Sequence, residues 1–368
     1  MAGRIVLFGA TGYTGDLTAR VLVARGAQPV LAARSEARVR ALAEELGGLE
    51  WALADVARPE TVRALVGDGD VLLSTVGPFA RWGDPAVEAA IAAGAHYVDS
   101  TGEPPFIRRV FEHYGPRAQA AGSALVTALG YDWTPGNLAG ALALRDAGAA
   151  ATRVRIGYFM TGSAGSDGMS GGTRASATGA LLEPSFAWRG GRLVTERGGK
   201  RMHAFEARPG KRLQAISVGS SEHFALPAVH PGLREVGVYL GWFGPASRGV
   251  QAFSLATAAI TKLPGARGAL QALSARAVKG STGGPDAAAR ATTGSLIFAE
   301  ALDDAGTVLA SVRLEGANGY DFTAGMLAWG AQQLAAGAVR DAGALGPVGA
   351  FGLDALEAGA AEAGIHRA

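Results

Sequence analysis

The sequence of 368 residues contains no cysteine. Disulfide bonds, thiolate catalysis, iron–sulfur clusters and cysteine-ligated zinc sites are therefore excluded. Lysine is also scarce, because only four of the 34 basic residues are lysine and the others are arginine. None of the seven tyrosines is followed four residues later by a lysine, so the Tyr-x-x-x-Lys pair of short-chain dehydrogenases is missing.

Runs of like charge and metal-ligand spacings are missing too. The 34 basic and 32 acidic residues give a net charge of +2, and their mixed distribution provides no electrostatic footprint for a nucleic acid. The six histidines do not fall at metal-ligand spacing. The sequence therefore predicts neither a nucleic-acid partner nor a metal site.

No uncharged stretch has the composition of a transmembrane segment. The longest one, 322–339, contains two glutamines and three glycines, and we expect it to form a buried helix. The N-terminus carries a short apolar segment at 5–8, which is typical of a strand rather than of a signal peptide. We therefore expect a cytoplasmic protein.

What the sequence does contain is enough apolar surface for a large core. Apolar residues make up 48% and charged residues 18%, and the mean hydropathy is +0.17. This composition excludes intrinsic disorder, because burial of the apolar area can offset the loss of chain entropy. A chain of this length is too long for one compact core, so two domains are expected.

Residues 1–135 alternate short apolar segments with helical patterns. Strands are predicted at 5–8, 30–33, 51–54, 71–74, 96–99 and 123–127. Helices are predicted at 13–25, 36–46, 59–66, 85–93 and 105–121, the last with a break at Pro116. This rhythm predicts a dinucleotide-binding α/β domain of the Rossmann type, with a doubly wound parallel sheet.

A glycine-rich turn follows the first predicted strand and opens the first predicted helix. Its three glycines allow a tight turn, close approach of the backbone to a pyrophosphate, and close packing of helix on strand. The start of the helix then offers N–H donors to the phosphates. This context favours a dinucleotide site over a merely structural turn. The residues expected to bind the cofactor here are Gly9, Ala10, Thr11, Gly12, Tyr13, Thr14 and Gly15.

The choice between NAD and NADP depends on the end of the second predicted strand. An NAD site usually has an acidic residue there, which accepts from the ribose 2′-hydroxyl. Here the strand is followed by Arg34 and Ser35, with Arg38 one helical turn later. Arg34 and Ser35 can bind a 2′-phosphate, so NADP(H) is the predicted cofactor. Asp55, after the third strand, is placed either to reach the adenine edge or to cap a nearby helix.

Three further loops should meet at the carboxyl edge of the same sheet. They follow the fourth, fifth and sixth predicted strands and are polar or rich in glycine. Such loops at one edge predict a nicotinamide pocket. The expected cofactor contacts in the first two are Thr75, Val76, Gly77, Pro78, Phe79, Asp99, Thr101 and Gly102, and the third loop spans 130–136.

These motifs together resemble the saccharopine dehydrogenase-like oxidoreductases, the group of saccharopine reductases and trans-acting enoyl reductases. The resemblance implies hydride transfer from a nicotinamide cofactor to a C=N or an activated C=C bond. One loop departs from the family pattern, because Trp133 and Thr134 separate Asp132 from the proline. The motifs are GATGYTG (9–15), STVGPF (74–79), HYVDSTGE (96–103), GYDWTPG (130–136), SGGTRAS (170–176) and GYDFTAGML (319–327).

The rhythm changes after about residue 150. Strands are predicted at 152–160, 193–196, 212–217, 224–227, 235–240, 293–301 and 307–315, and helices at 173–182, 250–262 and 266–278. This pattern predicts an α+β substrate domain over 136–318 with a mainly antiparallel sheet. Two helices, at 322–339 and 354–364, close the chain, and the resemblance implies that residues 319–368 pack back on the dinucleotide-binding domain.

Few residues could donate a proton or hold the substrate. Tyr131 could donate a proton or pack beside the cofactor, and Asp132 could act in catalysis or anchor its loop. Thr173 and Arg174 follow two glycines at a predicted helix start, where they could bind a substrate anion or where Thr173 could cap the helix. Solvent could also supply the proton.

The sequence therefore predicts an NADPH-dependent reductase that acts on a C=C or C=N bond of a small, partly hydrophobic metabolite. The aromatic segments 239–243 and 186–188 favour such a substrate, or they form ordinary core. The substrate could be free or linked to a carrier or lipid, and a homodimer is expected from the general frequency of two-fold assemblies. The alternative is a regulatory protein that binds NADP(H) without turnover.

Overall fold

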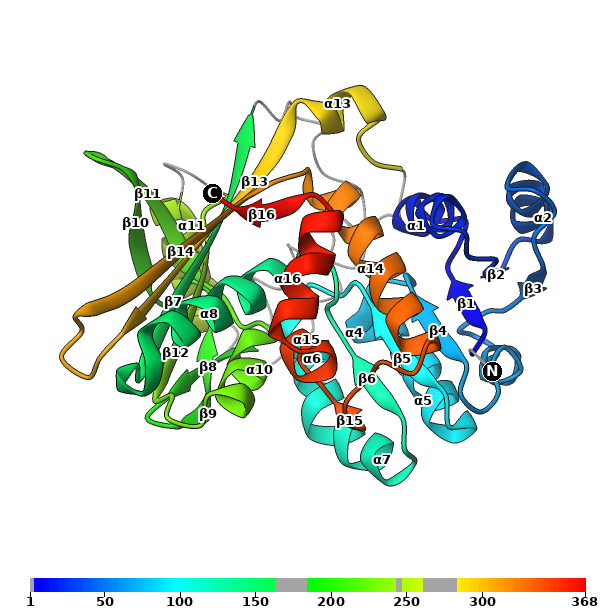
Figure 1. Cartoon of the computed structure of the whole chain (residues 1–368), viewed down its shortest axis with the longest axis horizontal. Helices are drawn as coiled ribbons and strands as arrows, with labels where there is room; N and C mark the ends of the chain where they lie inside the picture. The colour runs from blue at the N-terminus through cyan, green and yellow to red at the C-terminus, as the bar shows by residue number, and fades with distance from the viewer. Residues whose placement is uncertain (1–2, 163–183, 243–246, 261–282) are drawn as a thin grey trace. The chain divides into compact units, whose positions relative to one another are not determined.

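The computed structural model describes residues 3–162, 184–242, 247–260 and 283–368 (Figure 1). The chain divides into two compact units. Unit 1 contains residues 1–102, 106–134 and 317–365, and unit 2 contains residues 103–105, 135–316 and 366–368. In the described ranges, no helix is both long enough and apolar enough to cross a membrane.

Unit 1 is built on a seven-stranded sheet in which every pair of neighbours runs parallel. Its order is β15-β6-β5-β4-β1-β2-β3. The central strands are buried along their whole length, as expected where helices cover both faces of a parallel sheet. The strands are β1 (Ile5–Phe8), β2 (Val30–Ala33), β3 (Trp51–Leu53), β4 (Val71–Ser74), β5 (His96–Asp99), β6 (Ala124–Val126) and β15 (Gly343–Ala344).

The helices of unit 1 follow the strands, and one of them returns from the C-terminal part of the chain. That helix, α14 (Gly319–Ala335), packs beside α1 (Tyr13–Ala24) and over β4 and β5 (Figure 1). Most of its apolar side chains are buried, and those of Phe322 and Leu327 are completely so. The other helices are α2 (Glu36–Glu45), α3 (Pro59–Arg63), α4 (Phe79–Trp82), α5 (Asp84–Ala93), α6 (Pro104–Arg109), α7 (Gly115–Ala120), α15 (Pro347–Phe351) and α16 (Leu353–Glu362).

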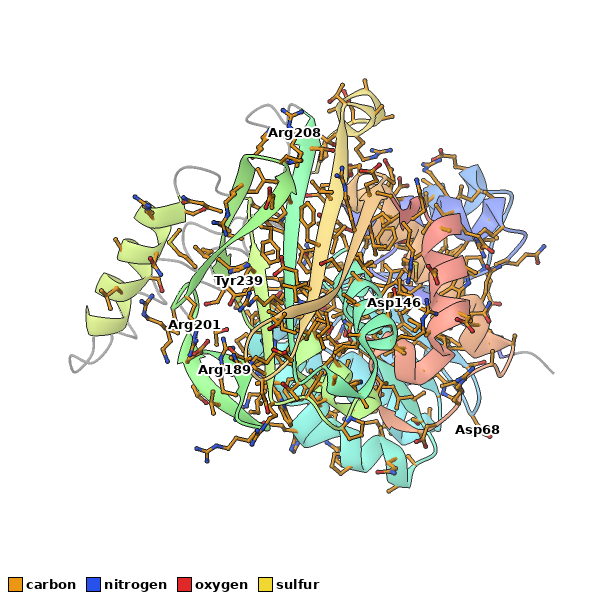
Figure 2. The ribbon with its side chains drawn as sticks, turned by 60° about the vertical axis from the view of Figure 1, so that its left-hand side comes forward. Asp68, Asp146, Arg189, Arg201, Arg208 and Tyr239 are labelled. Carbon is orange, nitrogen blue, oxygen red and sulfur yellow. The ribbon has the colours of Figure 1, made fainter. Side chains whose placement is uncertain are left out.

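Unit 2 contains a nine-stranded, mainly antiparallel sheet in which β12 and β7 run parallel. Its helices are α8 (Thr134–Ala147), α10 (Glu222–Val229), α11 (Ser247–Ile260) and α13 (Ala287–Ala291). Figure 2 labels Arg189 and Tyr239, which lie on the neighbouring strands β8 and β12. The strands are β7 (Arg153–Gly162), β8 (Pro184–Arg189), β9 (Arg192–Arg197), β10 (Met202–Arg208), β11 (Lys211–Ser217), β12 (Glu235–Leu240), β13 (Thr293–Leu302), β14 (Val308–Gly316) and β16 (Ile365–Arg367).

The predicted fold class is confirmed, since a doubly wound parallel sheet is joined to an α+β part with a mainly antiparallel sheet. One predicted element is wrong: residues 224–227 belong to the helix α10 and not to a strand. An apolar run of four residues does not distinguish a strand from a helix. The helix is closed by hydrogen bonds from Ala225 N to Ser221 O (2.9 Å) and from His230 N to Leu226 O (2.9 Å).

The predicted helix at 105–121 is divided differently from the expectation. Instead of a break at Pro116, the chain forms a π-helical segment at Val110–Tyr114 between α6 and α7. Proline lacks an N–H and its ring clashes with the carbonyl four residues earlier, which here belongs to Glu112 inside that wider turn. The predicted helices at 173–182 and 266–278 lie outside the described residues.

Candidate functional site

The glycine-rich turn has the backbone geometry that a pyrophosphate site needs. Gly9 has a φ of +93°, and its N–H and that of Ala10 donate to the carbonyl of Ala32, at 2.8 and 3.2 Å. A Cβ atom on Gly15 would overlap the carbonyl oxygen of Gly9, so α1 can pack this closely only with glycine there. Gly12 precedes α1 without a side-chain cap. The first N–H groups of the helix therefore remain available to phosphate oxygens.

The loop after β4 packs directly on this turn. The N–H of Thr75 donates to the carbonyl of Phe8 at 2.9 Å, and its hydroxyl lies 3.2 Å from the carbonyl oxygen of Gly9. A Cβ atom on Gly9 would come within 2.7 Å of the Thr75 hydroxyl and 2.9 Å of Val76 Cγ2. Gly77 is exposed next to Pro78 at the same edge. Phe79 instead faces the core and packs on Phe106, with ring centroids 5.7 Å apart.

The residues expected at the 2′-phosphate lie at the end of β2. Arg34 is exposed and has no hydrogen bond or ion pair to any described residue, and Ser35 precedes α2 with its hydroxyl not used as a cap. Arg38 donates through Nη2 to the carbonyl of Thr11 at 2.7 Å, so it braces the glycine-rich turn. Asp55 accepts from the N–H of Ala57 at 2.9 Å and closes a turn that ends before α3.

Asp99 has a different position from the one expected, because its carboxylate points into the protein. Oδ1 accepts from the N–H groups of Thr101 and Ala128, both at 2.9 Å, and Oδ2 accepts from the Thr127 hydroxyl at 2.8 Å. Its carbonyl also accepts from the N–H of Leu129 at 2.9 Å. Asp99 is fully buried and therefore ties together the loops after β5 and β6. Burial raises the pKa of this carboxyl to about 6.

The replacement Asp99→Asn is expected to change how stability depends on pH. A pKa of about 6, above the ordinary value of 3.8, means that the folded protein binds this proton more tightly than the unfolded chain. The destabilisation by the ionised carboxyl is therefore absent below about pH 4 and complete above about pH 6. Asparagine keeps the oxygen acceptor and does not titrate. As the pH rises from 4 to 7, the free energy of unfolding of the variant should increase relative to that of the wild type by up to about 3 kcal/mol.

Urea denaturation at several pH values measures this difference. Parallel curves for the two proteins between pH 4 and pH 7 would contradict the account of Asp99. The expected change has one sign only, because the donors around the carboxylate lower its pKa by less than burial raises it.

Asp132 is the one carboxyl group of the loop after β6, and its residue is half-buried. Its Oδ1 is inaccessible to solvent and has no hydrogen-bond partner among the residues that the structure describes. Burial raises the pKa of this carboxyl to about 7. A Cβ atom on Gly102 would lie 2.9 Å from Asp132 Oδ2, so the absence of a side chain at Gly102 leaves room for the carboxyl. A carboxylic acid with such a pKa can donate a proton near neutral pH.

Tyr131 is held by the C-terminal helix, which sequence analysis did not connect with this loop. Its N–H donates to the Thr323 hydroxyl at 2.9 Å, and a Cβ atom on Gly319 would lie 3.1 Å from its ring. At the same helix start, the ring of Tyr320 meets that of Tyr13 edge to face, with centroids 5.2 Å apart. The GYDFTAGML motif contained these residues, but 192 positions separate Tyr131 from Thr323.

A second polar cluster, also missed in the sequence, lies inside unit 2. The Tyr158 hydroxyl accepts from the N–H of Gly136 at 2.8 Å and donates to Glu222 Oε1 at 2.7 Å. Asn137 donates through Nδ2 to the Ser221 hydroxyl at 2.9 Å. All of these side chains are fully buried. The cluster therefore fixes the first turn of α8 against β7 and α10.

The other residues that the sequence suggested for the site either pack within unit 2 or lie outside the described ranges. Phe186 is buried and meets the His223 ring edge to face, while Trp188 Nε1 donates to the carbonyl of Leu233 at 2.9 Å, as ordinary core would. Thr173 and Arg174 are outside the described residues. No group of three metal ligands occurs in the described part of the chain.

Comparisons with known proteins agree with this geometry. Residues 5–126 match the profile of the saccharopine dehydrogenase NADP binding domain. The trans-acting enoyl reductases of Mycobacterium ulcerans and Mycobacterium tuberculosis are 41% identical over 140 residues, which cover 36% of this chain and 34% of each relative. The match thus spans about a third of the length of these relatives.

The solved structure of apo saccharopine dehydrogenase (L-Glu forming) from Saccharomyces cerevisiae has the same fold. It superimposes with a TM-score of 0.58 and 14% identity, over 97% of this chain and 96% of that one. The glycine-rich turn and the exposed Arg34 fit an NADP cofactor, so the predicted cofactor is confirmed together with the resemblance. Residues 5–126 are thus similar to the saccharopine dehydrogenase NADP binding domain, and the chain shares the fold of saccharopine dehydrogenase.

Proposed function

We propose that this chain is an NADPH-dependent reductase that transfers hydride to an activated double bond, and that the bond is the C=C of an enoyl substrate. The observation that carries the proposal is the carboxyl of Asp132, whose Oδ1 is shielded from solvent, in the NADP-binding unit itself, on the loop after β6. In sheets of this kind the cofactor binds outside the carboxyl ends of the strands. The names of the mycobacterial relatives favour C=C over C=N.

The cofactor is held by backbone at its centre and by side chains at its ends. The N–H groups of Thr11 and of the first turn of α1 would bind the pyrophosphate, whereas that of Gly12 donates to the carbonyl of Gly9 at 2.9 Å. Arg34 with Ser35 would bind the 2′-phosphate. Thr75–Gly77 and Thr101–Gly102 would line the nicotinamide end. The carboxylate of Asp99 makes no cofactor contact in this proposal, because both its oxygens already accept hydrogen bonds from the protein.

The chemistry that NADPH would supply when bound is a hydride for the β-carbon of the enoyl group. The electron pair of the C=C bond moves toward the carbonyl, and the α-carbon then needs a proton. Asp132 donates it from its carboxyl group and recovers it from solvent. A pKa of about 7 keeps much of this carboxyl protonated at neutral pH.

The test of the activity is NADPH oxidation against panels of α,β-unsaturated acyl thioesters and of cyclic imines. We expect turnover on the first panel. Tight NADPH binding without turnover on either panel would favour the alternative, a regulatory protein that holds NADP(H). Turnover on imines alone would support the reductase activity but would show that the substrate is not an enoyl group. The partly hydrophobic substrate, its attachment to a carrier or lipid, and a homodimer belong to the same proposal.

The role of Arg34 can be tested separately. Arg34→Ala is expected to weaken NADPH binding about 10-fold and to leave NADH binding unchanged, because NADH lacks the 2′-phosphate. Fluorescence titration of both dinucleotides measures the effect. Arg40→Ala is the matched control, since Arg40 lies on α2 and pairs with Glu44 at 3.0 Å. Equal losses for the two dinucleotides would contradict the role of Arg34.

A further inference from the structure

Thr323 joins the C-terminal helix to the loop that carries Asp132. Its hydroxyl accepts from the N–H of Tyr131 at 2.9 Å and donates to the carbonyl of Gly319 at 2.7 Å. The residue is 9% exposed. A threonine that both accepts and donates in this way is held in one rotamer, so the position of the Tyr131 N–H is set by α14.

Glycines on both sides let the helix and the loop approach closely. A Cβ atom on Gly130 would lie 3.0 Å from Thr323 Cγ2 and 3.1 Å from its hydroxyl. A Cβ atom on Gly319 would lie 3.1 Å from the Tyr131 ring. Since neither glycine has a positive φ, their small size at this contact is what the packing uses.

The loop has anchors at its other positions as well. Leu129 N donates to Asp99 O at 2.9 Å, Trp133 N to Ala128 O at 3.1 Å and Thr134 N to Gly130 O at 3.0 Å. These bonds connect the loop to β5 and to itself. Thr323 adds the bond from α14, next to the residue that carries the carboxyl.

We propose that Thr323 is a positioning residue for the protonation step, because it holds the loop at 130–134 so that the Asp132 carboxyl stays against Gly102. The inference rests on the proposed role of Asp132. It also explains why the helix that returns from the end of the chain begins at this edge: its first turn contacts Tyr13 of the cofactor turn and Tyr131 of the loop.

The test compares Thr323→Val, which removes the hydroxyl at nearly constant volume, with Thr323→Ser, which keeps it. We expect Thr323→Val to lower kcat about 10-fold through misplacement of the carboxyl, and Thr323→Ser to restore most of the rate. The Kd for NADPH should be unchanged. Thr18→Val is the matched control, because the Thr18 hydroxyl bonds within its own helix, to the carbonyl of Thr14 at 2.8 Å.

A readout that needs no turnover separates this inference from the proposed activity. The carboxyl of Asp132 can be titrated by ¹³C NMR in the ligand-free protein, with Asp132→Asn identifying its signal. Thr323→Val should let water reach the carboxyl and lower its pKa from about 7 toward the ordinary value. If this shift occurs while Asp132→Asn keeps full activity, the positioning stands and the catalytic role of Asp132 fails.

Gly130→Ala is a second variant, in case Thr323→Val is too unstable to assay. Its methyl group pushes the loop away from Thr323 while the hydroxyl remains. We therefore expect a lower kcat and a lower pKa of Asp132, as in Thr323→Val. An unchanged kcat and an unchanged titration in whichever of these variants folds would overturn the inference.

Discussion

Asp132→Asn is expected to lower kcat by about 10²- to 10⁴-fold, the usual contribution of a positioned general acid. Asparagine has the same size and leaves the cofactor turn untouched, so the Kd for NADPH should not change. Steady-state rates and fluorescence titration give the two quantities. Asp146→Asn is the control, because Asp146 lies in unit 2 at the end of α8 and pairs with Arg367 at 3.5 Å (Figure 2).

The pH dependence of the wild-type rate provides a second arm of the same prediction. Burial raises the pKa of Asp132 to about 7, so the proton-donating form predominates below this pH and is lost above it. The rate of the protonation-limited step should therefore be constant below about pH 7 and fall about tenfold per pH unit above it. An Asp132→Asn variant with wild-type kcat would show that solvent supplies the proton.

Gly9→Ala is expected to weaken NADPH binding about 100-fold, because the added methyl group displaces the loop after β4 from the glycine-rich turn. The methyl carbon would come within 2.7 Å of the Thr75 hydroxyl and 2.9 Å of Val76 Cγ2. The backbone of the turn would have to move away from the position that a pyrophosphate requires. Isothermal titration calorimetry with NADPH measures the effect.

Gly26→Ala is a closely matched control for this substitution. Gly26 has a φ of +80°, close to the +93° of Gly9, and an added Cβ there would meet nothing within 4 Å. Both variants therefore lose about 1 kcal/mol of stability from the left-handed backbone conformation. Equal Kd values for NADPH in the two variants would contradict the argument from the close contact.

Much of unit 1 could be predicted from the sequence because its information is local. The bounds of β1, β2, β4 and β5 coincide with their predictions, since buried parallel strands appear as short apolar runs between turns. Short or polar elements were missed: β15 has two residues, and the π-helical segment before α7 leaves no compositional signal. The helix α10 was taken for a strand because its apolar run was too short to show a period.

The candidate site was predictable where one loop carries it, as in the cofactor turn. It was not predictable where distant segments meet. The contacts of Tyr131 with Thr323 and of Tyr158 with Glu222 join residues 192 and 64 positions apart. The inward direction of Asp99 had a weaker signal: it shares a face of β5 with the buried Tyr97, two residues earlier.

The most direct test of the central claim is the fate of a deuterium label. The protein would be incubated with NADPH deuterated at both C4 positions and an α,β-unsaturated acyl thioester, and the product analysed by mass spectrometry and NMR. We expect one deuterium at the β-carbon, and, when the solvent is D₂O, a second at the α-carbon, with the rate lost in Asp132→Asn. NADPH that binds tightly but transfers no label to any enoyl acceptor would contradict the account.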